Sequence, residues 1–363
     1  MVAPTGARRR ELAEPIPRSM RACFLESKLA ITVRETATPR PRPHDVLVRI
    51  DAVGVCGSDV HFYRDGRVGD LVVDAPLILG HEASGHIVAV GSKTSRERIG
   101  ERVAIEPQRP CRRCRYCLTG RYNLCESMEF FSAPPIDGAL AEYLCVPADF
   151  AYRVPDSVSD AAAALLEPLS VAIAAVRKAR VTPGSAVLVS GAGPIGVLTA
   201  AAARAFGATR VVVSDPIPER LVVASRFGAT DVSDPTVDES IDDSVDAYID
   251  ASGSRSAIHS GIRALHRGGT AVLVGMGAPT VELDLFLLQS REISLHGLFR
   301  YVDTWETALA IAQSGTIRLD DLVSGTLGLD DVDYALQHNS DPNVMKFIIT
   351  PGQRTEERSP VNA

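Results

Sequence analysis

Residues 76–86, PLILGHEASGH, bring two histidines and a glutamate into an otherwise apolar stretch. Cys56 follows a separate apolar run, in the segment VGVCGSDVH. A catalytic zinc ion needs about three protein ligands and one open position for water or substrate. Cys56, His81 and Glu82 have suitable chemistry, and they follow two predicted strands whose ends could converge. A further acid, Glu167, stands in the apolar segment LLEPLS, where a carboxylate is unusual.

Each of these residues also has a plainer explanation. A single cysteine at the end of a strand is usually a small buried residue, and a single histidine is usually a core or surface residue. The combination of GHE, CGSD and LLEP in one chain, together with the cofactor pattern described below, favours a metal site instead.

Residues 111–125, CRRCRYCLTGRYNLC, place four cysteines in one short loop: Cys111, Cys114, Cys117 and Cys125. Four thiolates form a closed tetrahedral zinc site, which ties down a lobe with little core of its own. An iron–sulfur cluster uses the same ligands, and four free thiols are a third interpretation. Nothing else in the chain indicates electron transfer, so zinc is favoured. Four ligands leave no open position, and we therefore expect this site to be structural.

A glycine-rich loop, GAGPIG, follows the apolar run AVLVS and precedes a predicted helix. Its glycines are spaced as G-x-G-x-x-G, the dinucleotide-binding pattern in its required strand–turn–helix setting. Gly191 permits a tight turn, Gly193 allows the backbone to approach a pyrophosphate, and Gly196 lets helix and strand pack closely. The amino terminus of the helix offers free N–H groups to the phosphates.

The residue that selects the cofactor is predicted to be Asp215, at the end of the next apolar run. A carboxylate there can accept both hydroxyls of an adenosine ribose and repels a 2′-phosphate, which favours NAD over NADP. Alternatively, Asp215 could cap the following helix. Arg220 could lie over the adenine or reach a phosphate.

The elements that must position these residues change character along the chain. The first 160 residues or so are predicted to be mostly β, with little helix and with strands at 46–53, 86–91, 102–105 and 141–146. Pro168 is expected to kink or divide the helix-rich stretch that follows. Strands at 186–190, 210–215, 246–252 and 270–275 then alternate with helices at 194–206 and 218–228. This alternation predicts an α/β fold with a parallel sheet that is covered on both faces.

Length and composition set the outer limits. The chain has 363 residues, which favours two domains, and a net charge of −7, which argues against a general nucleic-acid or membrane-surface role. No apolar run is long enough to cross a bilayer. The basic segment near the start lacks the apolar region of a secretory signal, and its composition predicts a disordered tail over residues 1–20. Clustered cysteines without such a signal favour a reducing, cytoplasmic location.

Several segments together resemble the zinc-dependent medium-chain dehydrogenases, and within them the polyol branch of sorbitol and xylitol dehydrogenases. The resemblance covers roughly residues 22–350 and is carried by the segments VGVCGSDVHFYRDGRVGD, PLILGHEASG, RVAIEP, GRYNLC, FFSAPPIDGALAEY, LLEPLSV, GAGPIG and GLFRY. It implies a mostly-β GroES-like catalytic domain at 21–168 and 303–363, with a zinc lobe near 108–128. It also implies a Rossmann NAD-binding domain at 169–302.

The resemblance also implies roles for individual residues. Cys56, His81 and Glu82 would bind the catalytic zinc, and Glu167 would hold the metal-bound water or enter the zinc shell. Ser58 and His61 fall where the family often places a proton relay. The residues implied to face substrate are Glu167, Arg300, Tyr301 and Phe62, the last of which replaces a tyrosine common in sorbitol enzymes. The residues implied to contact the cofactor are Gly191, Gly193, Pro194, Ile195, Gly196, Asp215, Arg220, Val274, Gly275, Met276, Leu298, Phe299 and Arg300.

The expected function is therefore the zinc-dependent oxidation of a secondary hydroxyl of a polyol, with hydride transfer to NAD. Another zinc secondary-alcohol dehydrogenase, of the butanediol or threonine type, is the alternative. A non-catalytic NAD-binding protein is disfavoured because the ligand set is complete. The family further implies a homotetramer.

Overall fold

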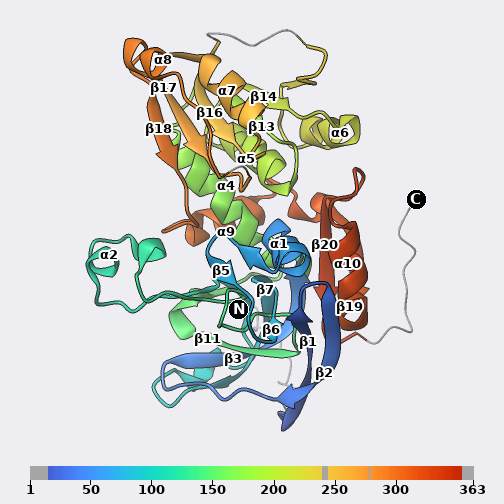
Figure 1. Ribbon diagram of the computed structural model, residues 1–363. Helices are drawn as coiled ribbons and strands as arrows, with labels where there is room; N and C mark the ends of the chain where they lie inside the picture. The colour runs from blue at the N-terminus through green and yellow to red at the C-terminus, as the bar shows by residue number, and fades with distance from the viewer. Residues whose placement is uncertain (1–14, 239–243, 278, 354–363) are drawn as a thin grey trace, which may run out of the picture.

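The computed structural model describes residues 15–238, 244–277 and 279–353, which form two bodies (Figure 1). One body is built from mostly antiparallel sheets and combines the amino-terminal part of the chain with the parallel pair β19 and β20 near its end. The other is built around a six-stranded parallel sheet. The fold is thus a GroES-like domain joined to a Rossmann-type domain, as predicted. No helix in the described residues is long and apolar enough to cross a membrane.

The GroES-like body is centred on a seven-stranded sheet of order β12-β8-β7-β3-β20-β19, with β11 also paired to β3. Strand β20 pairs with β3 through Ile348 opposite Gly54 and Ile349 opposite Val53, so two distant parts of the chain share one sheet. Its strands are β3 (Asp45–Gly54), β7 (Glu82–Val90), β8 (Arg102–Ile105), β11 (Tyr143–Pro147), β12 (Ala151–Arg153), β19 (Val323–Gly328) and β20 (Lys346–Thr350). The smaller sheets contain β1 (Ser19–Ser27), β2 (Ala30–Ala37), β4 (Arg67–Val68), β5 (Leu71–Val72), β6 (Leu77–Ile78), β9 (Gln108–Arg109) and β10 (Glu129–Phe130).

The Rossmann sheet has the order β15-β14-β13-β16-β17-β18, with every neighbouring pair parallel. Its strands are β13 (Ala186–Ser190), β14 (Arg210–Ser214), β15 (Asp231–Ser233), β16 (Val245–Asp250), β17 (Leu265–Leu273) and β18 (Ser294–Gly297). Because β13 and β14 are buried on both faces, their sequences are runs of valine and leucine rather than alternating patterns.

Ten helices occur in the described residues, most of them short. They are α1 (Gly57–Asp65), α2 (Arg115–Leu118), α3 (Asp160–Ala164), α4 (Leu166–Lys178), α5 (Pro194–Ala205), α6 (Pro218–Arg226), α7 (Arg255–Arg263), α8 (Leu285–Ser290), α9 (Trp305–Ser314) and α10 (Val332–His338). Helices α4 and α5 share one core cluster with the strands β13 and β14. Their alanines are buried there, which lets the helices approach the sheet closely.

One local expectation was wrong. Helix α1 was missed in a segment expected to be mostly β, because its sequence GSDVHFYRD shows no clear apolar period; a capping box between Cys56 and Asp59 begins the helix instead. The expectation for Pro168 was confirmed, because the helix-rich stretch is divided at Leu165 into α3 and α4. Pro168 lies in the first turn of α4, where its missing N–H costs no helical hydrogen bond; in one continuous helix its ring would clash with the carbonyl of Ala164.

The tail predicted over residues 1–20 falls mainly on residues 1–14, which lie outside the described residues. The first strand begins at Ser19, so the last two residues of the segment expected to be disordered already belong to β1.

Candidate functional site

The residues that could do chemistry surround a cleft between the two bodies, with a volume of about 280 Å³. The GroES-like body lines it with Val55, Cys56, Gly57, Ser58, His61, Glu82, Asn339, Ser340 and Lys346. The Rossmann body lines it with Gly193, Pro194, Ile195, Arg220, Ala251, Val274, Gly275 and Met276. Sequence segments more than 200 residues apart therefore share one wall.

One end of the cleft holds the first ligand set. Cys56, His81 and Glu82 each offer one potential ligand atom, and these three atoms lie within 4.8 Å of one another. Cys56 is the N-cap of α1, and His81 and Glu82 stand at the start of β7, next to β3. The three residues supply sulfur, nitrogen and oxygen ligands at one point and leave room for a fourth, which is the composition of a catalytic zinc site.

Asp59 holds Cys56 and His81 of this set in place, and it was not identified from the sequence. Its buried carboxylate accepts hydrogen bonds from the backbone N–H of Cys56 at 3.0 Å, from that of Gly80 at 3.2 Å and from Ser132 Oγ at 3.0 Å. His81 Nδ1 lies 3.6 Å from Asp59 Oδ1. Burial opposes the charged form of Asp59, yet His81 and the backbone donors hold its pKa below the usual value. The carboxylate thereby orients the imidazole and leaves its Nε2 for a metal.

Lys346 was also not identified from the sequence. It forms an ion pair with the third ligand, Glu82. Its buried Nζ donates to Glu82 Oε1 at 2.8 Å, to Glu82 Oε2 at 2.9 Å and to Val55 O at 2.9 Å. A lysine inside the apolar strand KFIIT was the available signal, because a fully buried lysine almost always has a partner. The ion pair holds the Glu82 carboxylate in one position.

Glu167 lies beside this set, at the first turn of α4. Its Oε1 accepts a hydrogen bond from Tyr301 Oη at 2.8 Å. Burial raises the pKa of Glu167 to about 7, with His81 opposing and Glu82 adding to the rise. Glu167 is therefore near the ligands and holds a proton more readily than an ordinary glutamate.

Arg300 and Tyr301 approach the site from the Rossmann side. The Arg300 guanidinium lies 4.0 Å from the centre of the Phe130 ring and 4.6 Å from that of Phe299, and Phe130 in turn contacts the His81 ring at 5.6 Å. Burial lowers the pKa of Arg300 to about 10, so it stays charged at neutral pH. Tyr301 is buried, and its hydroxyl is occupied by Glu167.

Ser58 and His61 line the cleft on one face of α1. The exposed His61 has Nδ1 3.0 Å from Asp65 Oδ2, one turn further along the helix. Phe62, on the same helix, is 4 % exposed and packs in the core of the GroES-like body instead of lining the cleft.

The glycine loop closes the other end of the cleft. Gly191 has φ +92°, which a residue with a side chain rarely adopts, and a Cβ at Gly196 would lie 1.7 Å from Gly191 O. A Cβ at Gly193 would meet nothing within 4 Å, and this residue borders the cleft. The loop thus exposes bare backbone at the start of α5, which is what a pyrophosphate needs.

Asp215 is tied to this loop. Its Oδ2 accepts from the N–H of Ala192 at 2.7 Å and its Oδ1 from that of Ile217 at 2.8 Å. An ionised carboxylate has about four acceptor sites, so two remain for a ribose. Arg220 lines the cleft and donates from Nη2 to Ser340 O at 3.2 Å, which links α6 to the other body.

The remaining predicted cofactor residues fall in two groups. Val274, Gly275 and Met276 follow β17 and line the cleft. Leu298, Phe299 and Arg300 follow β18, where Leu298 donates its N–H to Leu273 O at 2.9 Å. Phe299 is 57 % exposed. These three are not among the residues that line the cleft in the described chain.

The second ligand set lies apart from the cleft, in the lobe around α2. Sulfur atoms of Cys111, Cys114, Cys117 and Cys125 lie within 4.8 Å of one another. Backbone N–H groups point at these sulfurs, including that of Cys111 toward Cys125 at 3.2 Å and that of Cys114 toward Cys111 at 3.4 Å. Hydrogen bonds led by the Cys117 backbone lower the pKa of Cys114 to about 6. Backbone N–H groups also lower the pKa of Cys111, whereas burial raises that of Cys117 to about 12. Two of the four thiols thus become thiolates more readily than an ordinary cysteine, and a closed zinc site requires thiolates.

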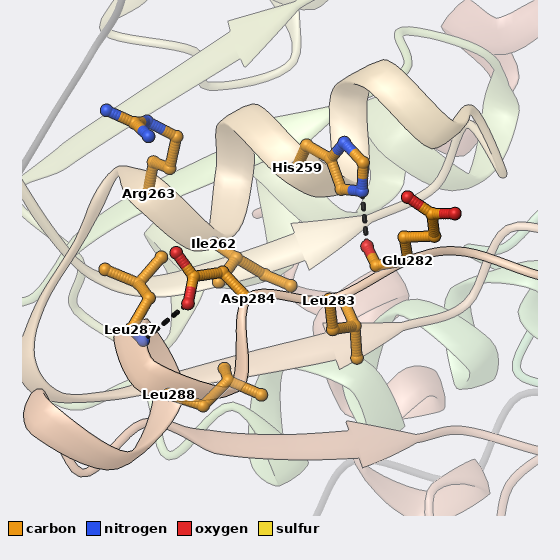
Figure 2. Close-up of a pocket in the computed structure, with 8 residues that line it drawn as sticks. All are labelled: His259, Ile262, Arg263, Glu282, Leu283, Asp284, Leu287 and Leu288. Carbon is orange, nitrogen blue, oxygen red and sulfur yellow. Dashed lines mark hydrogen bonds between the residues drawn. The ribbon is translucent and has the colours of Figure 1, made fainter.

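A further hollow, of about 350 Å³, belongs to neither ligand set (Figure 2). It lies between α7 and α8 at the edge of the Rossmann sheet, with Ile262, Leu283, Leu287 and Leu288 among its walls. Its polar contacts are internal: Asp284 caps α8 through Leu287 N, and His259 contacts the Glu282 carbonyl.

A GroES-like body, a Rossmann sheet and two zinc sites, one with four cysteines and one with Cys, His and Glu, define a zinc-dependent dehydrogenase. Comparison with known proteins agrees. Residues 42–156 match the alcohol dehydrogenase GroES-like domain family, and residues 194–314 match the zinc-binding dehydrogenase family. The chain belongs to the zinc-containing medium-chain dehydrogenases, in their polyol branch.

Individual relatives are similar to this chain over most of its length. It is 42 % identical over 320 residues to a probable D-xylulose reductase A from Neosartorya fischeri, covering 85 % of this chain and 89 % of that one. It is 35 % identical over 355 residues to a sorbitol dehydrogenase from Bacillus subtilis, covering 94 % and 100 %. The structure of L-idonate 5-dehydrogenase from Escherichia coli superposes with a TM-score of 0.87 at 31 % identity, covering 92 % and 98 %.

Proposed function

We propose that this enzyme oxidises a secondary hydroxyl of a polyol such as sorbitol or xylitol to the ketose, with NAD as the acceptor. The observation that carries the proposal is the single cleft in which Cys56 and Glu82 face the bare backbone of Gly193. Metal-ligand chemistry and dinucleotide-binding geometry meet there. The relatives named as xylulose reductase and sorbitol dehydrogenase support a polyol substrate.

In this proposal Cys56, His81 and Glu82 hold the catalytic zinc, with Glu167 beside them. The four-cysteine lobe holds the structural zinc. Bound in these places, zinc supplies a Lewis acid that acidifies the substrate hydroxyl, and NAD accepts a hydride.

The proton from the substrate hydroxyl leaves through Ser58 and His61. Both residues line the cleft, and His61 contacts Asp65 at the exposed side of α1, so the path ends in solvent. Glu167, with its raised pKa, offers a second place for a proton beside the ligand set. Asp59 keeps His81 in one orientation throughout, because its carboxylate is held by three other donors.

Selectivity for a polyol is assigned to Arg300. Its guanidinium is held over Phe130 near His81 and makes no hydrogen bond within the part of the chain that the structure describes, whereas the Tyr301 hydroxyl is used to orient Glu167. A site built to hydrogen-bond neighbouring hydroxyls can reject an alcohol lacking them by a factor on the order of 10⁴. Glu167 and Phe62 complete the proposed surroundings of the substrate. Phe62 contributes only through its packing in the core of the GroES-like body.

NAD binding is assigned to the glycine loop with Pro194 and Ile195, to Asp215 for the ribose and to Arg220 for the adenine side. The residues Val274–Met276 would border the cofactor along the cleft, and Leu298–Arg300 would lie beside the nicotinamide. A preference for NAD over NADP follows from Asp215, because its carboxylate is fixed and would face a 2′-phosphate.

The test is NADH formation with a substrate panel: sorbitol, xylitol, ribitol, arabitol, mannitol, butanediol and threonine. Arg300→Ala is the companion variant, and it should lose the preference for polyol over butanediol. Activity on butanediol or threonine alone would keep the zinc chemistry and reject the polyol assignment in favour of the alternative enzyme type.

We also propose a homotetramer in the cytoplasm. Strand β18 forms the edge of the Rossmann sheet, and the adjoining helix α8 exposes Leu285 at 65 % and Phe286 at 77 % beside the leucine-lined hollow of Figure 2. Light scattering on the protein and on Phe286→Asp tests this: the variant should yield smaller assemblies. No disulfide joins the seven cysteines, all of which lie in the described residues, and this suits a reducing compartment.

A further inference from the structure

Another buried acid, Glu106, has no role in the steps above. It follows β8, and its residue is 0 % exposed. Three side-chain donors converge on its carboxylate: Tyr122 Oη at 2.9 Å, Tyr152 Oη at 3.0 Å and Gln108 Nε2 at 2.9 Å. A buried carboxylate with this many partners acts as the centre of a polar network.

Each of the three donors also reaches one segment, residues 299–305, which leads from β18 to α9. Gln108 Nε2 donates to Tyr301 O at 3.3 Å. Tyr122 Oη accepts from the N–H of Asp303 at 3.3 Å. The Tyr152 ring stacks on that of Trp305, with centres 5.2 Å apart and planes 11° from parallel. Each of the three side-chain donors to the Glu106 carboxylate is therefore also a partner of this segment.

The segment needs such support because its backbone is strained. Arg300 has φ +56° and Asp303 has φ +55°, values that L residues with side chains rarely adopt. Such residues keep these angles only where their surroundings hold them. The same segment carries Arg300 and Tyr301, and the Tyr301 hydroxyl donates to Glu167 beside the ligand set. Asn123 from the cysteine lobe donates to Phe299 O at 2.9 Å and so holds the first residue of the segment.

We propose that Glu106 is a positioning residue for polyol recognition: through Gln108, Tyr122 and Tyr152 it fixes the segment 299–305 and thereby the guanidinium of Arg300. This inference rests on the proposed function of Arg300. It assigns the recognition of the substrate's further hydroxyls to a network centred on Glu106, outside the metal-ligand set. It also ties the four-cysteine lobe to specificity, because Tyr122 belongs to that lobe.

 The influence of Glu106 on the substrate passes through the segment 299–305 and Arg300.

The experiment compares Glu106→Gln with Glu35→Gln, a matched change at an exposed glutamate of β2. Assays run at pH 9, because burial raises the pKa of Glu106 to about 8 and the carboxylate is then ionised. An amide offers one acceptor oxygen to three converging donors and turns an N–H₂ group toward the rest. We expect the polyol-to-butanediol ratio of kcat/KM to fall on the order of tenfold in Glu106→Gln, chiefly through KM for the polyol. Glu35→Gln should leave the ratio unchanged.

Two milder variants keep the test informative if Glu106→Gln folds poorly. Tyr122→Phe removes the hydroxyl that joins Glu106 to Asp303, whereas Tyr152→Phe keeps the ring that stacks on Trp305. The first should lower the ratio more than the second. A general loss of stability would lower both substrates' kcat/KM together and leave the ratio intact, which would overturn the proposal.

Hydrogen–deuterium exchange gives a readout that does not depend on the substrate. Peptides covering 297–305 should exchange faster in Glu106→Gln than in the wild type or in Glu35→Gln, and unchanged exchange there would overturn the positioning role. If the wild type oxidises butanediol and no polyol, the proposed function fails by itself, and the exchange experiment still decides whether Glu106 holds the segment.

Discussion

The ion pair between Lys346 and Glu82 makes the sharpest prediction about the metal site. Both groups are buried, and Nζ lies 2.8 and 2.9 Å from the two carboxylate oxygens. Lys346→Met keeps the length of the side chain and leaves Glu82 as an uncompensated buried charge. Breaking a buried pair in this way costs about 3–5 kcal/mol. At about 2 °C per kcal/mol for a chain of this size, the metal-free protein should lose roughly 6–10 °C in Tm.

Zinc changes this expectation. A cation bound by Glu82 replaces the charge that Lys346 supplied, so the loss should be smaller in the zinc-loaded protein. If zinc recovers about 2 kcal/mol, linkage requires the variant to bind zinc on the order of 30-fold more tightly than the wild type does.

The assay is calorimetry of both proteins with zinc and after chelation, with Lys93→Met, at an exposed lysine, as the control. The control should shift little in either state. An equal loss in Tm with and without zinc would refute the reasoning, because it would mean that Glu82 does not face the metal.

Four further predictions follow from the site. Cys56→Ser should abolish turnover and lower the zinc content by about one ion per chain while the fold persists, as measured by metal analysis and circular dichroism; full activity without that zinc would reject the ligand. Asp215→Ala should raise KM for NAD far more than KM for NADP, and an unchanged cofactor ratio would contradict the ribose role. Cys114→Ser should lower Tm before it alters kcat, so lost turnover at unchanged Tm would count against a structural lobe. For Glu106, the folded pKa of about 8 lies above the ordinary 4.5, so the folded state binds the extra proton between these values. Its contribution to stability is present below about pH 4.5 and is lost as the pH rises to about 8. Across this pH range the free energy of unfolding of the wild type should therefore fall, relative to that of Glu106→Gln, by roughly a few kcal/mol. Free energies of unfolding that change with pH in parallel in the two proteins would contradict this.

The sequence predicted the parts of this molecule that depend on local pattern. The strands 186–190 and 102–105 coincide with β13 and β8, because apolar runs bounded by glycine or charged residues mark a strand whatever lies around it. The four cysteines fall within one loop, so their spacing alone predicted that they would meet.

The parts that could not be predicted depend on contacts between distant segments. Lys346 and Glu82 are 264 residues apart in the chain, and only the pairing of β20 with β3 brings them together. The Glu106 network likewise joins Gln108 to Tyr301 across 193 residues. Helix α1 was missed for a local reason, since its capping by Cys56 and Asp59 leaves no apolar period to read.

The measurement that tests the central claim most directly is NADH formation from NAD with sorbitol and xylitol, before chelation, after chelation and after zinc is restored. The account predicts turnover of at least one polyol that is lost with the chelated metal and regained with zinc. Undiminished turnover in protein shown to lack zinc at Cys56, His81 and Glu82 would contradict it.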